Sequence, residues 1–71
     1  MRYERIRQLR ENAELTQEKV GQAINVPQRT YAYYESGQRI IPPSVLCAIA
    51  DYYNVSVDYL LGRTDIRETN R

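Results

Sequence analysis

The sequence predicts an all-α fold, a single domain built from five short helices. Seventy-one residues are enough for one domain with one modest hydrophobic core. Apolar side chains recur at spacings of three and four residues, which is the period of a helix buried along one face. Residues that commonly begin or end helices separate these periodic segments. We place the folded domain at residues 1–62 and a polar tail at residues 63–71.

The first helix is expected over residues 3–13, with Ile6, Leu9 and Ala13 on its buried face. Arginines and glutamates alternate along the rest of its surface. Pairs of opposite charge three or four residues apart stabilise an exposed helix face. Most of these charges are therefore predicted to be solvated.

A pair of helices joined by a short turn is predicted next. Thr16 is a good N-cap, because its hydroxyl can accept a hydrogen bond from the first free backbone N–H groups. The helix that it begins is expected over residues 17–24, where Val20 and Ile24 share one face. Asn25 tolerates the left-handed conformation that ends a helix.

The second helix of the pair is expected over residues 28–36, with Tyr31 and Tyr34 facing inward and Gly37 closing it. A turn of three or four residues cannot fold this helix back antiparallel, so the two helices must cross steeply. Gly21 fits this crossing, since a residue without a side chain permits a close approach. Together the two segments predict a helix-turn-helix.

Two further helices complete the domain. One is expected over residues 43–53, following a pair of prolines, and a short one follows Ser56 as its N-cap and ends at Gly62. The residues that these helices are expected to turn inward are apolar or aromatic: Leu46, Ile49, Ala50, Tyr53, Val57, Leu60 and Leu61.

Several segments, taken in their order and spacing, carry a resemblance to a known family. Leu15-Thr16-Gln17 begins the second helix, Tyr34-Glu35-Ser36-Gly37 ends the third, and Val55-Ser56-Val57-Asp58-Tyr59-Leu60-Leu61-Gly62 forms the last. With the Arg- and Glu-rich first helix, they resemble the Cro and Xre-like, phage-repressor type of helix-turn-helix regulators. The resemblance covers residues 3–62.

This resemblance implies a lambda-repressor-like five-helix domain whose third helix enters the major groove of double-stranded DNA. It implies a sequence-specific transcriptional regulator of the prokaryotic cytoplasm, acting as a repressor that occupies an operator. A homodimer is implied as well, because two half-sites multiply a modest single-domain affinity.

The residues predicted to contact bases lie on the outward side of the third helix: Gln28, Arg29, Ala32 and Tyr33. Glutamine can pair with an adenine edge, and arginine with O6 and N7 of guanine. Ala32 is small enough to admit a thymine methyl group, and Tyr33 could donate to a phosphate or pack on a sugar. The alternative for each polar residue is an ordinary exposed surface position.

A second set is predicted to contact the DNA backbone: Arg10, Gln17, Thr30 and Arg39. The resemblance implies these roles for Gln17, where helix N–H groups favour a phosphate, and for Arg39. Arg10 is included because it lies near the end of the first helix. The Thr30 hydroxyl could equally bond within its own helix.

Two residues depart from the family pattern. Pro27 stands where a capping serine or threonine is usual, so the third helix loses a cap oxygen. Tyr31 replaces the usual isoleucine or valine, and its hydroxyl needs a partner or a path to solvent. Either change could alter the tilt of the third helix.

Composition excludes several classes of function. The chain has no histidine and one cysteine, which removes intrachain disulfides, zinc clusters and histidine-based catalysis. We therefore expect no enzyme, cofactor, metal ion or small-molecule ligand. Cys47 lies in an apolar run and is expected to be buried. A lone cysteine also suggests a reduced, cytoplasmic setting. No segment approaches the ~20 apolar residues of a membrane span.

The net charge of +1 predicts modest non-specific affinity for DNA, since that term scales with the phosphates neutralised. One alternative function is left open, an antitoxin-like or other protein-interaction module on the same fold. Tyr52 and Tyr59 lie towards the last two helices, where they would suit a subunit interface.

Overall fold

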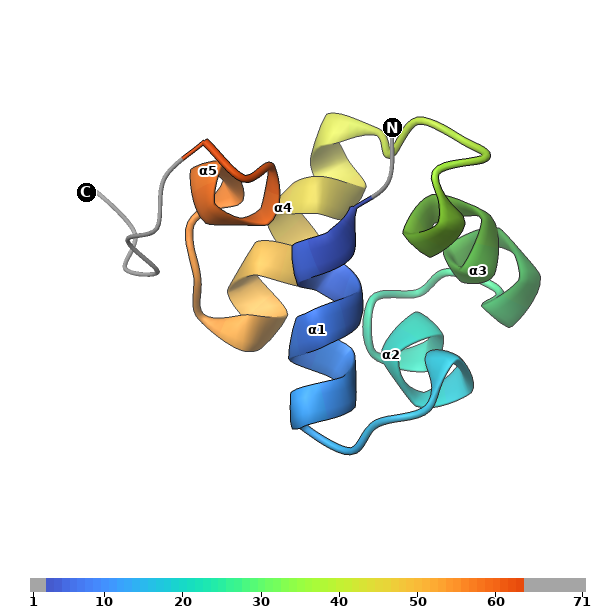
Figure 1. Ribbon diagram of the computed structural model, residues 1–71. Helices are drawn as coiled ribbons and strands as arrows, with labels where there is room; N and C mark the ends of the chain where they lie inside the picture. The colour runs from blue at the N-terminus through green and yellow to red at the C-terminus, as the bar shows by residue number, and fades with distance from the viewer. Residues whose placement is uncertain (1–2, 64–71) are drawn as a thin grey trace.

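Five α-helices follow one another in the computed structural model, which describes residues 3–63 (Figure 1). This confirms the all-α, five-helix fold predicted from the sequence. The polar tail assigned to residues 63–71 lies, beyond its first residue, outside the described residues. The helices are α1 (Glu4–Asn12), α2 (Gln17–Ala23), α3 (Gln28–Ser36), α4 (Pro43–Tyr53) and α5 (Val57–Leu60).

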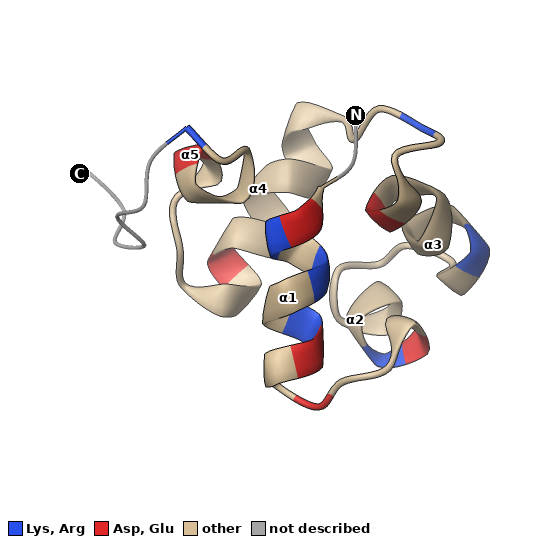
Figure 2. Cartoon of the chain, viewed as in Figure 1, with Lys and Arg blue, Asp and Glu red and all other residues tan. Residues whose placement is uncertain are grey.

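Helix α1 runs through the middle of the molecule, with α2 and α3 on one side, α5 on the other and α4 passing behind it (Figure 1). It contacts α3 and α5 directly, while α2 packs on α3 and α4 packs on α5. Figure 2 shows charges of both signs along α1, and basic positions at the start of α3 and in the loop after it. The central helix therefore links the helix pair α2–α3 to the rest of the fold.

The hydrophobic core gathers side chains from all five helices. Tyr31 of α3 is fully buried at 0% exposure, which confirms that it faces inward despite its size. The other buried apolar or aromatic residues are Tyr3, Ile6, Leu9, Val20, Ile41, Ile49, Ala50, Val55 and Leu60. Tyr34, Leu46, Tyr53, Val57 and Leu61 are partly buried around them.

Both predicted hydroxyl caps are present. The Thr16 hydroxyl accepts a hydrogen bond of 3.1 Å from the backbone N–H of Lys19, and the Ser56 hydroxyl accepts one of 3.0 Å from that of Tyr59. Pro27, the N-cap of α3, provides no side-chain cap, as the sequence predicted. The N-termini of α2 and α5 are thereby fixed by their own side chains.

All five helices end in the same way. A residue in the left-handed conformation is followed by one whose N–H bonds, at 2.8–3.1 Å, to the carbonyl five residues earlier. The left-handed residues are Glu14, Asn25, Gly37, Asn54 and Gly62. Asn25, Gly37 and Gly62 match the predicted helix ends, whereas Glu14 and Asn54 were not predicted.

Two expectations about burial are wrong. Ala13 is exposed, because α1 ends at Asn12 and Glu14 turns the chain away in the left-handed conformation. Cys47 is also exposed. It precedes the buried Ile49 by two residues, which places it about 200° away around the helix, on the side of α4 opposite the core.

Gly21 lies against the turn that joins α2 to α3. A Cβ atom at this position would stand 2.7 Å from the backbone oxygen of Val26, closer than carbon and oxygen atoms can pack. The N–H of Val26 in turn donates to the Gly21 carbonyl at 2.8 Å. The missing side chain therefore allows the turn to fold back onto α2 and sets where α3 begins.

Candidate nucleic-acid interface

The pair α2–α3 presents the start of α3 to solvent. Gln28 and Arg29, in the first turn of that helix, are both exposed. Thr30, Ala32 and Tyr33 are half-buried. Tyr31 is fully buried and Tyr34 is half-buried. The exposure of Gln28 and Arg29 and the burial of Tyr31 agree with the prediction, whereas Ala32 and Tyr33, predicted to face outward, are no more exposed by class than Tyr34, predicted to face inward.

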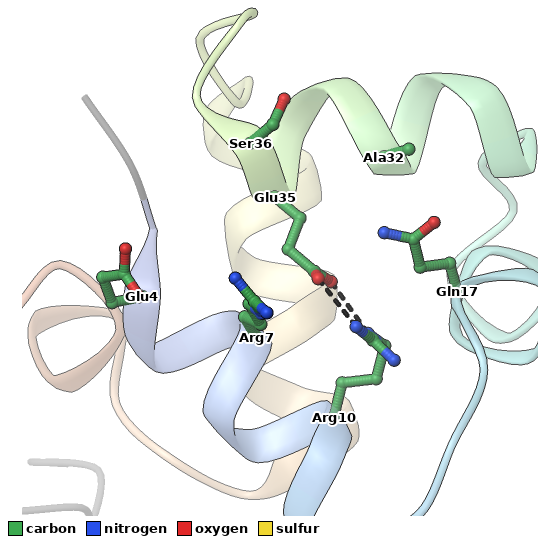
Figure 3. A pocket seen from close by; sticks show the side chains of 7 residues that line it. All are labelled: Glu4, Arg7, Arg10, Gln17, Ala32, Glu35 and Ser36. Carbon is green, nitrogen blue, oxygen red and sulfur yellow. Dashed lines mark hydrogen bonds and ion pairs between the residues drawn. The ribbon is translucent and has the colours of Figure 1, made fainter.

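Arg10 and Glu35 join α1 to α3 by a bidentate ion pair (Figure 3). The Nε and Nη2 groups of Arg10 donate to the two carboxylate oxygens of Glu35, each at 2.9 Å. Its Nη1 group donates to the Leu15 carbonyl, also at 2.9 Å. Only 15% of the Arg10 side chain and 5% of the Glu35 side chain are exposed.

This pairing changes the ionisation of both groups. Burial by itself would raise the pKa of Glu35, but the hydrogen bonds from Arg10, its positive charge and the contacts with the Tyr31 and Gln17 side chains together outweigh burial and lower the pKa below its usual value. The hydrogen bond to Glu35 likewise raises the pKa of Arg10. Both residues are therefore charged in the folded protein at neutral pH.

The sequence did not single out Glu35. The helical period that places Tyr31 inward also places Glu35, four residues later, on the same buried face. A buried carboxylate needs a positively charged partner. A glutamate on the buried face of a helix could therefore have been identified from the sequence as one half of an ion pair. Arg10, predicted to contact the DNA backbone, has three of its five N–H groups bonded within the protein, which leaves two for such a contact.

An open hollow of ≈ 340 Å³ lies between α1, the start of α2 and the side of α3 (Figure 3). It brings together Gln17 and Ala32, two residues predicted to contact DNA, beside the Arg10–Glu35 pair. Its full lining is Glu4, Arg7, Arg10, Gln17, Ala32, Glu35 and Ser36. Because both signs of charge are present, the hollow is not a purely basic surface.

The loop after α3 is bound back to Tyr33. The N–H groups of Gln38 and Arg39 both donate to the Tyr33 carbonyl, at 2.9 and 3.3 Å. The guanidinium carbon of Arg39 lies 5.0 Å from the centre of the Tyr33 ring, within the range of a cation–π contact. The structure thus places Tyr33, which was predicted to contact bases, against Arg39, which was predicted to contact the DNA backbone.

Two hydroxyls are buried among residues 3–63, those of Tyr31 and Tyr53. The Tyr31 hydroxyl lies near the Glu35 carboxylate: burial raises its pKa, and the negative charge of Glu35 and a side-chain interaction with it act in the same direction. The same interaction lowers the pKa of Glu35. Burial raises the pKa of Tyr53 to about 12, and this hydroxyl has no hydrogen-bond partner in the described part of the chain.

The last two helices present less aromatic surface than expected. The Tyr59 ring is covered by the Arg5 guanidinium, whose carbon lies 4.3 Å from the ring centre, and Arg5 also donates to the Tyr59 carbonyl at 3.2 Å. Tyr52 is 43% exposed and meets Tyr53 edge to face at 5.0 Å. Of the two, Tyr52 is the more open to a partner.

Across residues 3–63, no group of three or more candidate metal-ligating side chains gathers. No helix in the same range is long and apolar enough to cross a bilayer.

Residues 6–60 match a family described as "Helix-turn-helix", HTH_3. Three curated relatives come from Bacillus subtilis (strain 168). "Uncharacterized HTH-type transcriptional regulator YobD" is 40% identical over 62 residues, which cover 87% of this chain and 55% of that protein.

The other two relatives are more distant. "HTH-type transcriptional regulator ImmR" is 30% identical over 66 residues, covering 93% of this chain and 52% of the relative. "HTH-type transcriptional regulator AnsR" is 30% identical over 69 residues, covering 97% and 60%. The chain thus spans about half to three-fifths of the length of these proteins. No solved structure gives a significant match.

Proposed function

The chain belongs to the helix-turn-helix family and has its five-helix, lambda-repressor-like fold, and on this basis we propose that it binds double-stranded DNA in a sequence-specific manner and regulates transcription. The observation that carries this proposal is the first turn of α3. Two side chains suited to reading base edges, Gln28 and Arg29, are exposed there, on a helix that the buried Tyr31 and Glu35 hold against the rest of the domain.

In the proposed complex, α3 lies in the major groove. Gln28 pairs with an adenine and Arg29 with a guanine, each good pair contributing about 1–3 kcal/mol of discrimination. Ala32, further along the helix, contacts a thymine methyl group, and Tyr33 lies at the edge of the groove. Rigid support for α3 matters, because a small tilt would move the two polar side chains off their bases.

The DNA backbone is held on both sides of this helix. Gln17 occupies the first turn of α2, where free N–H groups favour a phosphate. Arg39 approaches the backbone from the loop after α3, and Thr30 is a further, weaker candidate. We give Arg10 mainly the task of bracing α1 against α3, with only the two N–H groups left over for a phosphate.

We further propose that the protein is a homodimer acting as a repressor. A single small domain with a net charge of +1 gains little from non-specific attraction to DNA. Two copies on half-sites one helical turn apart would combine their affinities. The exposed surface of α4, with Tyr52, is available for this contact.

The proposal is tested by selecting duplexes from a random DNA library. The wild type is compared with the double variant Gln28→Ala/Arg29→Ala and with the control Gln8→Ala/Arg63→Ala. The control removes the same residue types from exposed positions in α1 and after α5.

An enriched sequence that is lost in the first variant and kept in the control supports the proposal, and an inverted repeat supports the dimer. A single half-site would contradict the dimer alone. No enrichment at low salt would contradict DNA binding.

A further inference from the structure

Arg39 contacts Tyr33 both through its backbone and through its side chain. Gly37, in the left-handed conformation with a φ of 83°, reverses the chain after α3. The N–H groups of Gln38 and Arg39 then bond to the Tyr33 carbonyl, and the Arg39 guanidinium lies over the Tyr33 ring at 5.0 Å. The backbone and the side chain of Arg39 thus both contact Tyr33 of α3.

We propose that Tyr33 is a positioning residue, whose ring holds the Arg39 guanidinium ready for a DNA phosphate. This inference rests on the proposed DNA-binding function. It replaces the base contact predicted for Tyr33 with an action through Arg39. The ring, and not the hydroxyl, carries the effect, because the contact is made by the aromatic face.

The geometry of the guanidinium supports this assignment. Among residues 3–63, no carboxylate forms an ion pair with Arg39. A contact with the ring uses none of the N–H groups as donors to a carboxylate, so they remain available to bind phosphate oxygens. A free arginine must be ordered when DNA binds, and an arginine already held on a ring loses less freedom at that step.

Arg29 provides a contrast on the same helix. It is exposed, and no interaction of its side chain is found in the described part of the chain. A base-reading side chain must adjust to the base it meets, whereas a phosphate contact sets the register of the protein on the duplex. A held Arg39 beside a free Arg29 fits this division of roles.

The test is a double-mutant cycle on the selected duplex, measured at several salt concentrations. Arg39→Ala should reduce the slope of log affinity against log salt by about 0.9, the value of one phosphate contact. Tyr33→Leu keeps an apolar side chain but has no aromatic face, and should weaken binding roughly two- to fivefold, in line with an exposed cation–π contact. Tyr33→Phe should restore wild-type binding.

The double variant Tyr33→Leu/Arg39→Ala tests whether Tyr33 acts through Arg39. We expect it to bind no more weakly than Arg39→Ala alone, because Tyr33 acts only through Arg39. Fully additive losses would overturn the inference, as would a Tyr33→Phe variant as weak as Tyr33→Leu. Arg63→Ala, which removes an exposed arginine after α5, is the matched charge control.

A second measurement uses the free protein. By NMR, the side-chain methylene protons of Arg39 should be shifted upfield by the Tyr33 ring in the wild type and in Tyr33→Phe, but not in Tyr33→Leu. Unshifted protons in the wild type would overturn the inference. If the wild type selects no duplex at all, the DNA-binding proposal fails and this inference with it; additivity in a protein that does bind DNA refutes the inference alone.

Discussion

Arg10 and Glu35, twenty-five positions apart in the sequence, hold the first and third helices together through two hydrogen bonds of 2.9 Å. Glu35 lies about two turns further along α3 than the first turn that we propose reads DNA. Glu35 is the buried charged residue of the described core, and Arg10 is its counter-ion. The support of the candidate interface is therefore electrostatic as well as hydrophobic.

Removing one member of this pair should be costly. Arg10→Ala leaves the Glu35 carboxylate buried without a partner, and we expect a loss of about 3–5 kcal/mol in the free energy of unfolding. Arg7→Ala is the control, since the Arg7–Glu11 pair is more than half exposed and should contribute only about 0.3–0.5 kcal/mol. Urea unfolding measures both, and equal losses would contradict the bracing role.

The pair should also make stability depend on pH at the acidic end. The pKa of Glu35 is lowered by folding, so its stabilising effect is complete above the ordinary glutamate pKa of about 4.3. Below that pH the unfolded chain takes up a proton that the folded protein resists, and stability falls as the pH approaches the folded pKa.

The matching experiment compares urea midpoints of the wild type and Glu35→Gln between pH 7 and pH 3. The wild type should be the more stable protein at pH 7, and the difference should narrow below about pH 4.3. A difference that stays constant or widens on acidification would show that Glu35 is not the group responsible.

Gly21→Ala should destabilise the protein even though alanine favours helices by about 1 kcal/mol over glycine. The added Cβ would meet the Val26 oxygen at 2.7 Å, and overpacking of this kind costs about 1–3 kcal/mol. Thermal unfolding checks this, with the exposed Gln22→Ala in the same helix as control. A Gly21→Ala protein as stable as the wild type would mean that the turn can move away freely.

Tyr53→Phe should stabilise the fold. The Tyr53 hydroxyl is buried and has no hydrogen-bond partner among residues 3–63, and removing such a group should raise the free energy of unfolding by about 1 kcal/mol. The exposed Tyr52→Phe should stay within about 0.5 kcal/mol of the wild type. A loss of stability in Tyr53→Phe would show that this hydroxyl is hydrogen-bonded in the folded protein.

The sequence predicted most of the fold because its helix boundaries are encoded locally. Thr16, Ser56 and Asn25 act on backbone groups only a few residues away, so their roles can be inferred without the rest of the chain. Glu14 could not be found in this way, because a glutamate has no intrinsic preference for the left-handed conformation that it adopts. Its conformation depends on how the segment between α1 and α2 packs.

The interface was predicted less completely, for a related reason. Periodicity identifies Gln28 and Arg29 as outward residues, but it does not say which distant side chain meets which. The pairing of Arg10 with Glu35 depends on how α1 crosses α3. Cys47 was predicted to be buried because its neighbours in the sequence are apolar, but it lies on the side of α4 that faces away from the core.

The central claim is that Arg29 reads a base while Arg39 holds the backbone. The most direct measurement is the affinity of the wild type, Arg29→Ala and Arg39→Ala for the selected duplex and for every single base-pair substitution in it. Arg29→Ala should lose discrimination at one position, by about 1–3 kcal/mol, and keep it elsewhere. Arg39→Ala should weaken binding to all sequences alike. If Arg29→Ala also weakens every sequence equally, α3 does not read DNA through this residue and the account is wrong.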